Sequence, residues 1–184
     1  MTQFDKAAAQ RCFDDEPLGP NCDRVARYWL SLWRGGELPV RADFRPRDVA
    51  EQLPSLALFE VVPEHSVRCR LFGSVLAQGL GQDVTGKDWL ALTPEASRPL
   101  RLERFSTVAL GAIGRGLRAG MRESGEEQFS EEIMLPFGDV TEDGTRQVLI
   151  HIAWRQTAYN PTVTNVAHSG GLSVEFRLIP LQAA

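Results

Sequence analysis

The histidines are the first residues to consider for metal or acid–base chemistry, and the chain has three of them, His65, His151 and His168. A metal site needs ligands that converge on one point. These three fall in a turn, in an apolar strand segment and in a loop rich in proline and glycine, and no spacing groups them. We therefore expect no metal site.

His151 is the most informative histidine because Ile150 and Ile152 flank it. Side chains alternate between the two faces of a strand, so His151 should point away from both isoleucines, together with Leu149 and Ala153. The pattern predicts a core or semi-buried histidine bonded to backbone. A pocket-facing contact that senses pH or a ligand is the alternative.

The cysteines offer little for nucleophilic catalysis. Cys12, Cys22 and Cys69 are odd in number and lack the C-x-x-C spacing of zinc and redox sites, which favours a reducing cytoplasm. Cys69 alternates with Val67 and Leu71 on one strand face, which predicts a small buried residue with an inert thiol. The sequence also lacks a Gly-x-Ser-x-Gly motif, and we expect no catalytic residue.

Paired carboxylates could perform acid–base chemistry, but Glu131 and Glu132 are adjacent in a predicted strand and should point to opposite faces. We expect both to be solvated. Asp83 lies in a loop bounded by Gly81 and Gly86, where a carboxylate can accept local backbone N–H groups. It should bond its own loop and not act as a catalytic acid.

Composition restricts the class of protein. A chain of 184 residues with 43% apolar residues suits one domain with extensions. A net charge of −4 and a pI near 5.4 give no drive toward nucleic acid. No apolar run approaches the length of a membrane span, and the N-terminal residues are too charged for a signal peptide. We expect a cytoplasmic protein that binds neither membrane nor nucleic acid.

Hydrophobic periodicity places these residues on elements. Two strands joined by a short turn come first, then short helices, then three further strands, an α+β order. The expected helices are 21–34, 46–53, 75–79 and a region from 93 to about 114, and the expected strands are 56–62, 67–72, 117–122, 127–137 and 146–155. A further strand at 172–178 has no place in the sheet that the sequence can specify.

Two segments of the chain are informative together, and they read YWLSLWRGGELPVRADFRPRDVAEQLPSLALFEV and RLFGSVLAQGLGQDVTGKDWLAL. Their joint occurrence resembles the PAS domain, and more narrowly the PAS-like family common in alphaproteobacteria. The resemblance implies a five-stranded antiparallel sheet with helices on one face. Together with the residue pattern, it divides the chain into a flexible leader (1–20) that is either a short helix or disordered, an N-terminal helical extension (21–55), a PAS-like core (56–155), and a loop with a C-terminal extra strand (156–184) that departs from the family pattern.

The resemblance also implies where a small molecule would bind, between the sheet and the middle helices. Haem-binding PAS domains use a histidine on the long middle helix, and residues 98–113 contain none. Flavin-photoactive ones use a cysteine in a short helix after the second strand, and residues 75–89 contain none. We therefore expect no cofactor. The candidate pocket residues are Arg70, Trp89, Phe105, Met121, Met134 and His151, of which Trp89 and Phe105 also suit a plain core.

The first long helix carries more apolar surface than one sheet face can cover, an arc of roughly 200°. Its large members are Tyr28, Trp29, Leu30 and Trp33. We predict that the surplus binds a second protomer or a partner protein. The alternative is that residues 1–20, or the strand near 174–178, fold back over it and leave a monomer.

The predicted function is a non-enzymatic sensory or regulatory module that binds a small molecule or a protein partner and signals through protein contact, as a homodimer or with another protein. Two alternatives stay open. One is a small enzyme that acts on an organic substrate in the same α+β cavity, and the other is a structural interaction domain with a filled core.

Overall fold

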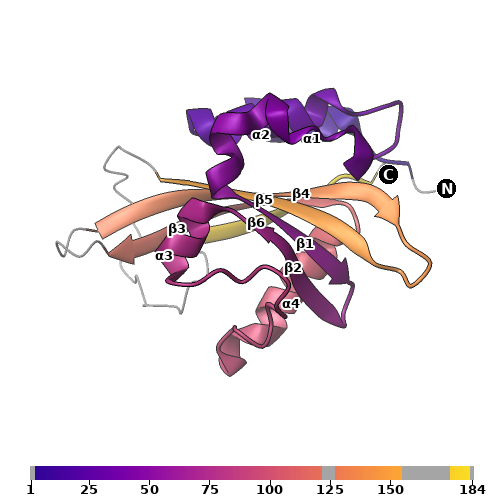
Figure 1. Ribbon diagram of the computed structural model, residues 1–184. Coiled ribbons are helices and arrows are strands. Elements are labelled where there is room, and N and C mark those ends of the chain that lie inside the picture. Colours follow the sequence, from indigo (N-terminus) through magenta and orange to yellow (C-terminus); the bar gives the residue numbers. More distant parts are fainter. Residues whose placement is uncertain (1–2, 122–126, 155–174, 183–184) are drawn as a thin grey trace.

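The centre of the molecule is one six-stranded antiparallel sheet with the strand order β2-β1-β5-β4-β3-β6 (Figure 1). The computed structural model describes all residues except 1–2, 122–126, 155–174 and 183–184, and describes only the backbone at 118–121, 127–128 and 154. The strands are β1 (Leu56–Val62), β2 (Ser66–Phe72), β3 (Ala112–Met121), β4 (Glu127–Val140), β5 (Arg146–Trp154) and β6 (Glu175–Pro180).

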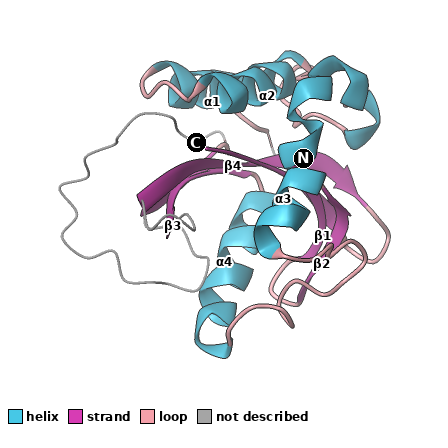
Figure 2. Ribbon diagram, turned by 60° about the vertical axis from the view of Figure 1, so that its left-hand side comes forward, coloured by secondary structure: helices cyan, strands magenta, loops and turns pink. Residues whose placement is uncertain are grey.

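Helices cover both faces of this sheet (Figure 2). Helices α1 (Lys6–Asp14) and α2 (Pro20–Ser31) lie on one face, and α3 (Ser74–Leu80) and α4 (Arg98–Ala109) lie on the other. Three 3-10 segments, η1 (Arg41–Asp43), η2 (Pro46–Ser55) and η3 (Glu95–Ser97), connect them. Within the described residues, no helix is both long and apolar enough to cross a membrane.

The layer of α1 and α2 forms one hydrophobic core with the sheet. Ala9 and Phe13 of α1 and Trp29 of α2 are fully buried, and they pack in one cluster with Ile133 and Leu149 of the sheet. Of the two forms expected for the leader, a short helix or a disordered segment, residues 6–14 therefore adopt the helix, and the description as flexible is corrected for this part of the chain. A nine-residue helix is not stable alone, because ordering a short segment costs entropy. Burial of the apolar side chains of Ala9 and Phe13 against α2 offsets that cost, and residues 6–14 are therefore helical.

A second core lies on the opposite face, under α4. Phe105 and Val108 of α4 pack with Phe59, Met134 and Ile150 of the central strands. These three strand residues alternate with residues of the first core, so each central strand is apolar on both faces. The sheet is thereby sandwiched between two helical layers.

The α+β class, the hairpin and the extra strand are confirmed. The extra strand is β6, which pairs with the outer edge of β3; its predicted first residues, 172–174, lie outside the described part. Strand β3 begins at Ala112, earlier than expected, because α4 ends at Ala109 and Gly111 reverses the chain with a φ of 109°. Pairing with β6 then draws residues 112–116 into the sheet.

Candidate functional site

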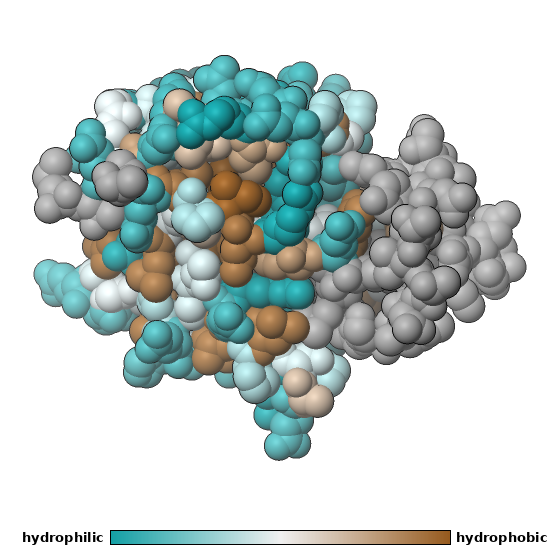
Figure 3. All heavy atoms as spheres, turned by 180° about the vertical axis from the view of Figure 1, so that it is seen from behind, coloured by the Kyte–Doolittle hydropathy of each residue, from teal (hydrophilic) through white to brown (hydrophobic). Residues whose placement is uncertain are grey.

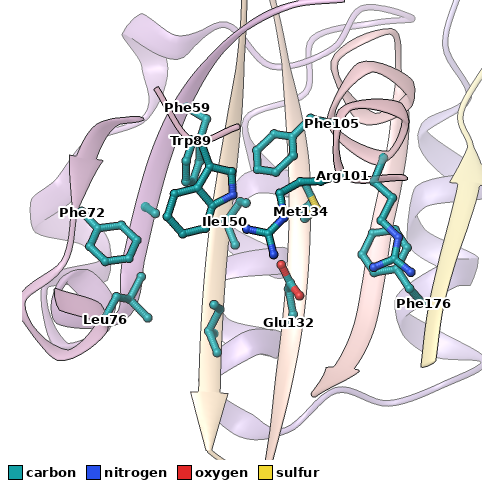
Figure 4. Close-up of a pocket in the computed structure, with 13 residues that line it drawn as sticks. Phe59, Phe72, Leu76, Trp89, Arg101, Phe105, Glu132, Met134, Ile150 and Phe176 are labelled. Atoms are coloured by element: carbon teal, nitrogen blue, oxygen red, sulfur yellow. The ribbon is translucent and has the colours of Figure 1, made fainter. Parts of the chain in front are cut away.

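A cavity of about 60 Å³ lies between the sheet and α4. Phe59, Met134 and Ile150 of β1, β4 and β5 form its floor, Phe105 of α4 faces them, and Trp89 of the preceding loop closes one side (Figure 4). All five side chains are apolar or aromatic. The cavity is therefore an opening within the second core, on the face where a ligand was expected.

The aromatic walls pack on one another. The ring centroid of Phe59 lies 4.9 Å from that of Phe105 and 5.5 Å from that of Trp89, and Phe72 lies 5.9 Å from Trp89. These are tilted or edge-to-face arrangements, which the aromatic quadrupole favours. The amide of Trp89 also donates to the carbonyl of Val67 at 2.8 Å, so the loop is fixed to β2.

Two oppositely charged side chains reach into this apolar space. Arg101 of α4 and Glu132 of β4 are each only 7% exposed, and they point toward one another (Figure 4). The guanidinium carbon of Arg101 also lies 5.1 Å from the ring centroid of Trp89, within cation–π range. The cavity can therefore offer a ligand both aromatic contact and polar groups of either sign.

Local spacing explains how these groups come together. Arg101 and Phe105 are four residues apart, on one side of α4. Glu132 and Met134 are two residues apart, on one face of β4. Glu131 points to the other face, where its carboxylate accepts the amide of Gly19 at 2.7 Å.

The expected opposite orientation of Glu131 and Glu132 is confirmed, but the expected solvation was wrong. Both are buried, with exposed fractions of 3% and 7%. The reason is that β4 is a central strand with helices on both of its faces. Neighbouring side chains such as Glu131 and Glu132 therefore point into different cores, and neither points into water.

The structure brings together three of the predicted pocket residues, Trp89, Phe105 and Met134. Arg70 does not join them, because it lies on the exposed face of β2 and forms an ion pair with Glu60 at 3.0 Å. The side chain of Met121 lies outside the described part of the chain.

His151 also lies outside the pocket, on the opposite face of the sheet. As expected, it points away from Ile150 and Ile152 and is buried, 1% exposed. Its Nδ1 atom lies 3.2 Å from the thiol sulfur of Cys22 in α2, so its partner is a side chain and not backbone. Burial lowers the pKa of His151 to about 4.

The predicted burial of Cys69 and the predicted bonding of Asp83 within its own loop are confirmed. Cys69 is buried, and burial raises the pKa of its thiol to about 11, which disfavours the reactive thiolate. Asp83 accepts the amide of Thr85 at 2.9 Å and the Thr85 hydroxyl at 2.8 Å. The Thr85 amide is the main cause that lowers the pKa of Asp83.

The residues proposed as a partner interface are largely covered by their own chain. Trp29, Leu30 and Trp33 are 0%, 7% and 6% exposed, and they share a core with Phe13 of α1. Only Tyr28 is half-buried, and its hydroxyl donates to Asp48 at 2.9 Å. The leader fills the surplus apolar arc, which corrects the role assigned to these side chains.

Sequence reasoning missed Arg101, Arg104, Glu132 and Phe176, which all line the cavity. A signal existed for Arg101 and Glu132, because each shares a helical or strand face with a predicted pocket residue, Phe105 or Met134. Phe176 alternates with Leu178 in a predicted strand, but its place in the sheet was not known. No local pattern could place it in the cavity.

The cavity residues do not fit a flavin or a haem. A cavity of about 60 Å³ is far below the roughly 300–1,000 Å³ of most small-molecule sites. The described residues that line it include neither histidine nor cysteine, the side chains that would bond haem iron or a flavin. Across the described part of the chain, no group of three or more potential metal-ligating side chains converges.

Comparison with known proteins gives a family match over most of the chain. The sequence profile of the family described as PAS domain matches residues 20–150. No curated protein sequence matches the chain. Among solved structures, it is similar to the Rhodobacter sphaeroides LOV protein at 15% identity and a TM-score of 0.37, over 56% of this chain and 61% of that one.

Two further structures are similar. One is a fungal LOV domain photoreceptor, at 14% identity and a TM-score of 0.36, over 55% of this chain and 76% of that one. The other is the PAS domain of an HTR-like protein from Haloarcula marismortui, at 16% identity and a TM-score of 0.32, over 62% of this chain and 98% of that one.

Proposed function

The chain belongs to the PAS domain family, and on that premise we propose that it is a non-enzymatic sensory or regulatory module. In this proposal a small organic molecule enters the cavity between the sheet and α4, and the resulting change is passed on through contact with another protein or a second copy of the chain.

The observation that carries the proposal is the mixed character of the cavity. Aromatic and aliphatic side chains together supply most of its wall, and Arg101, Arg104 and Glu132 supply charge. Small-molecule sites combine mostly apolar walls with a few polar groups that fix orientation. A core with no other task would avoid the cost of burying two charges.

A fragment screen followed by nuclear magnetic resonance tests the proposal, with two matched variants at adjacent positions of β5. Ile152→Phe adds bulk on the cavity face, and Ala153→Val adds bulk on the opposite face. We expect a bound fragment to lose at least about tenfold in affinity in the first variant only. Equal affinity in both variants would place binding elsewhere and overturn the proposal.

Contact with a partner protein or a second copy of the chain would need an exposed apolar surface. Exposed large apolar side chains are present at Leu71, Leu80, Leu110 and Val140, and apolar residues reach the surface between the helical layers (Figure 3). Such residues can support protein contact. A homodimer would use surfaces of this kind and not Trp33. Sedimentation velocity at micromolar concentration decides between monomer and dimer.

The small size of the cavity favours one second candidate, an interaction domain with a filled core. In that case the fragment screen finds no ligand in the cavity. An enzyme receives less support, because general acid–base or nucleophilic catalysis needs positioned reactive groups. Among the described lining residues, Glu132 is the one carboxylate, and it points toward Arg101.

A further inference from the structure

Phe176 enters the cavity from β6, outside the segment 20–150 that matches the PAS family. Strand β6 pairs in antiparallel register with β3, with Phe176 opposite Gly116 and Leu178 opposite Gly114. From there the ring reaches across β3 toward Met134 and the cavity (Figure 4). A strand beyond the matched segment thus completes the ligand site.

Gly114 provides the space for this ring. A Cβ atom at position 114 would lie 2.8 Å from Cζ of Phe176, and also 3.1 Å from Cβ of Met134. Only a residue without a side chain leaves room for Phe176 at this point. On its other side, the guanidinium carbon of Arg104 lies 4.2 Å from the ring centroid of Phe176 and stacks on it.

We infer that Phe176 is an internal occupant of the cavity, with which a ligand must compete for space. This inference rests on the proposed function, because it specifies how the same site is regulated. The remaining volume of about 60 Å³ holds a few water molecules and no aromatic ring in addition to Phe176. A ring-sized ligand therefore needs one of the walls to move.

Phe176 is a wall that can move without displacing the central strands or α4. Phe105 is 5% exposed and belongs to a helix that packs on the sheet, and Trp89 is fixed through its backbone to Val67. Phe176 is only half-buried, and β6 is one of the two edge strands and among the described strands pairs with β3 alone. Displacing its ring leaves the packed rings of Phe59, Phe105 and Trp89 in place.

Ligand binding and docking of β6 should consequently oppose one another. A ligand that takes the place of the Phe176 ring removes an apolar contact that holds β6 on β3. By linkage, the factor by which docking of β6 weakens ligand binding equals the factor by which the ligand weakens docking of β6. The position of the C-terminal strand would then report occupancy of the cavity.

Indole is a suitable probe because it is planar and consists of one fused ring system. Calorimetry measures the Kd of indole for the full chain. Phe176→Ala removes the occupant, and we expect binding about tenfold to a hundredfold tighter than in the wild type. Phe176→Leu keeps the strand apolar and should give an intermediate Kd if the alanine variant folds poorly. Gly114→Ala displaces the ring without shortening it and should also tighten binding.

Hydrogen exchange of residues 175–180 provides the second measurement. Saturating indole should speed exchange of these amides in the wild type and leave those of β1 unchanged. Ile150→Val is the control, because it enlarges the cavity from a central strand and leaves Phe176 in place. Indole should bind the Ile150→Val variant more tightly than the wild type, and its binding should change the hydrogen-exchange rate of residues 175–180 less than in the wild type.

Each outcome is decisive. If indole binds in the cavity of the wild type and Phe176→Ala leaves its Kd unchanged, or if binding slows the exchange of β6, the inference fails while the proposed function stands. If neither the wild type nor any of the enlarged variants binds indole, the inference is overturned, and the proposed function is overturned as well only if the fragment screen also finds no ligand in the cavity.

Discussion

The thiol sulfur of Cys22 lies 3.2 Å from Nδ1 of His151, although 129 positions separate the two residues in the chain. Cys22 belongs to α2 and His151 to β5, and both are buried. The contact therefore joins the N-terminal helical layer to the centre of the sheet. Because burial keeps the imidazole neutral, the contact has a predictable dependence on pH.

Stability should fall as the pH decreases from 6.5 to 4. The pKa of His151 is lowered from 6.5 to about 4 by burial, so in this range the unfolded chain binds a proton that the folded chain does not. Above pH 6.5 both states are neutral at His151, and the free energy of unfolding has its full value. It falls as the unfolded chain becomes protonated below pH 6.5, and the loss is complete once the pH has passed the folded-state pKa of about 4. We expect a loss of about 3 kcal/mol in the free energy of unfolding, measured by urea denaturation.

His65→Gln is the control for this measurement. His65 is exposed, and its ring nitrogen lies 2.8 Å from the carbonyl of Pro63 in its own turn. Its replacement should leave the pH profile unchanged, whereas His151→Gln should flatten it between pH 4 and 6.5. Equal slopes in the wild type and in a folded His151→Gln variant would contradict the assignment to His151.

The two tryptophans of the N-terminal layer should respond differently to replacement by phenylalanine. The indole N–H of Trp29 donates to the carbonyl of Pro136 at 2.9 Å, whereas that of Trp33 is buried and has no hydrogen-bond partner among the described residues. Both substitutions lose similar volume. Thermal denaturation should show Trp29→Phe to be the more costly by about 1–3 kcal/mol, the price of an unpaired buried carbonyl.

A result in which Trp33→Phe is the more destabilising substitution would mean that packing, and not the hydrogen bond to Pro136, dominates at these positions. Circular dichroism of both variants at low temperature verifies that each starts from the native fold.

Gly73→Ala should destabilise the protein although the backbone conformation allows it. Gly73 has a φ of −62°, but a Cβ atom there would lie 2.3 Å from the carbonyl oxygen of Pro54 and 2.7 Å from that of Leu53. Backbone atoms must move to relieve this overlap, at a cost of about 1–3 kcal/mol. Chemical denaturation measures the loss.

Gly79→Ala is the matched substitution within α3. A Cβ atom at position 79 meets nothing within 4 Å, and alanine favours the helix over glycine by roughly 0.5–1 kcal/mol. The variant should therefore be as stable as the wild type or more stable. If both alanine variants behaved alike, the close approach of η2 to the start of α3 would not be a constraint on the fold.

The purified protein should be colourless. The cavity is too small for a flavin or a porphyrin, and its described walls carry no side chain that would bond to either. Absorption spectroscopy after gel filtration is the measurement. A visible band that elutes with the protein, and that acid extraction recovers as a free chromophore, would show that the cavity opens far enough for a cofactor.

The sequence alone determined the α+β order and the limits of the first hairpin. Both depend on local signals, because alternation of apolar side chains and turn residues act over a few positions. The predicted strand 56–62 agrees with β1 for this reason. The orientation of His151 away from Ile150 and Ile152 likewise depends only on the geometry of a strand.

The tertiary structure alone decided which residues meet. The apolar arc of the first predicted long helix indicated that something must cover its surplus, but only packing showed that Trp33 shares one core with Ala9 and Phe13 of α1. Arg101 faces Glu132, and Phe176 reaches Gly114, through contacts between elements that are far apart in the chain. Such contacts depend on the register and stacking of whole elements, which residue spacing within one element cannot encode.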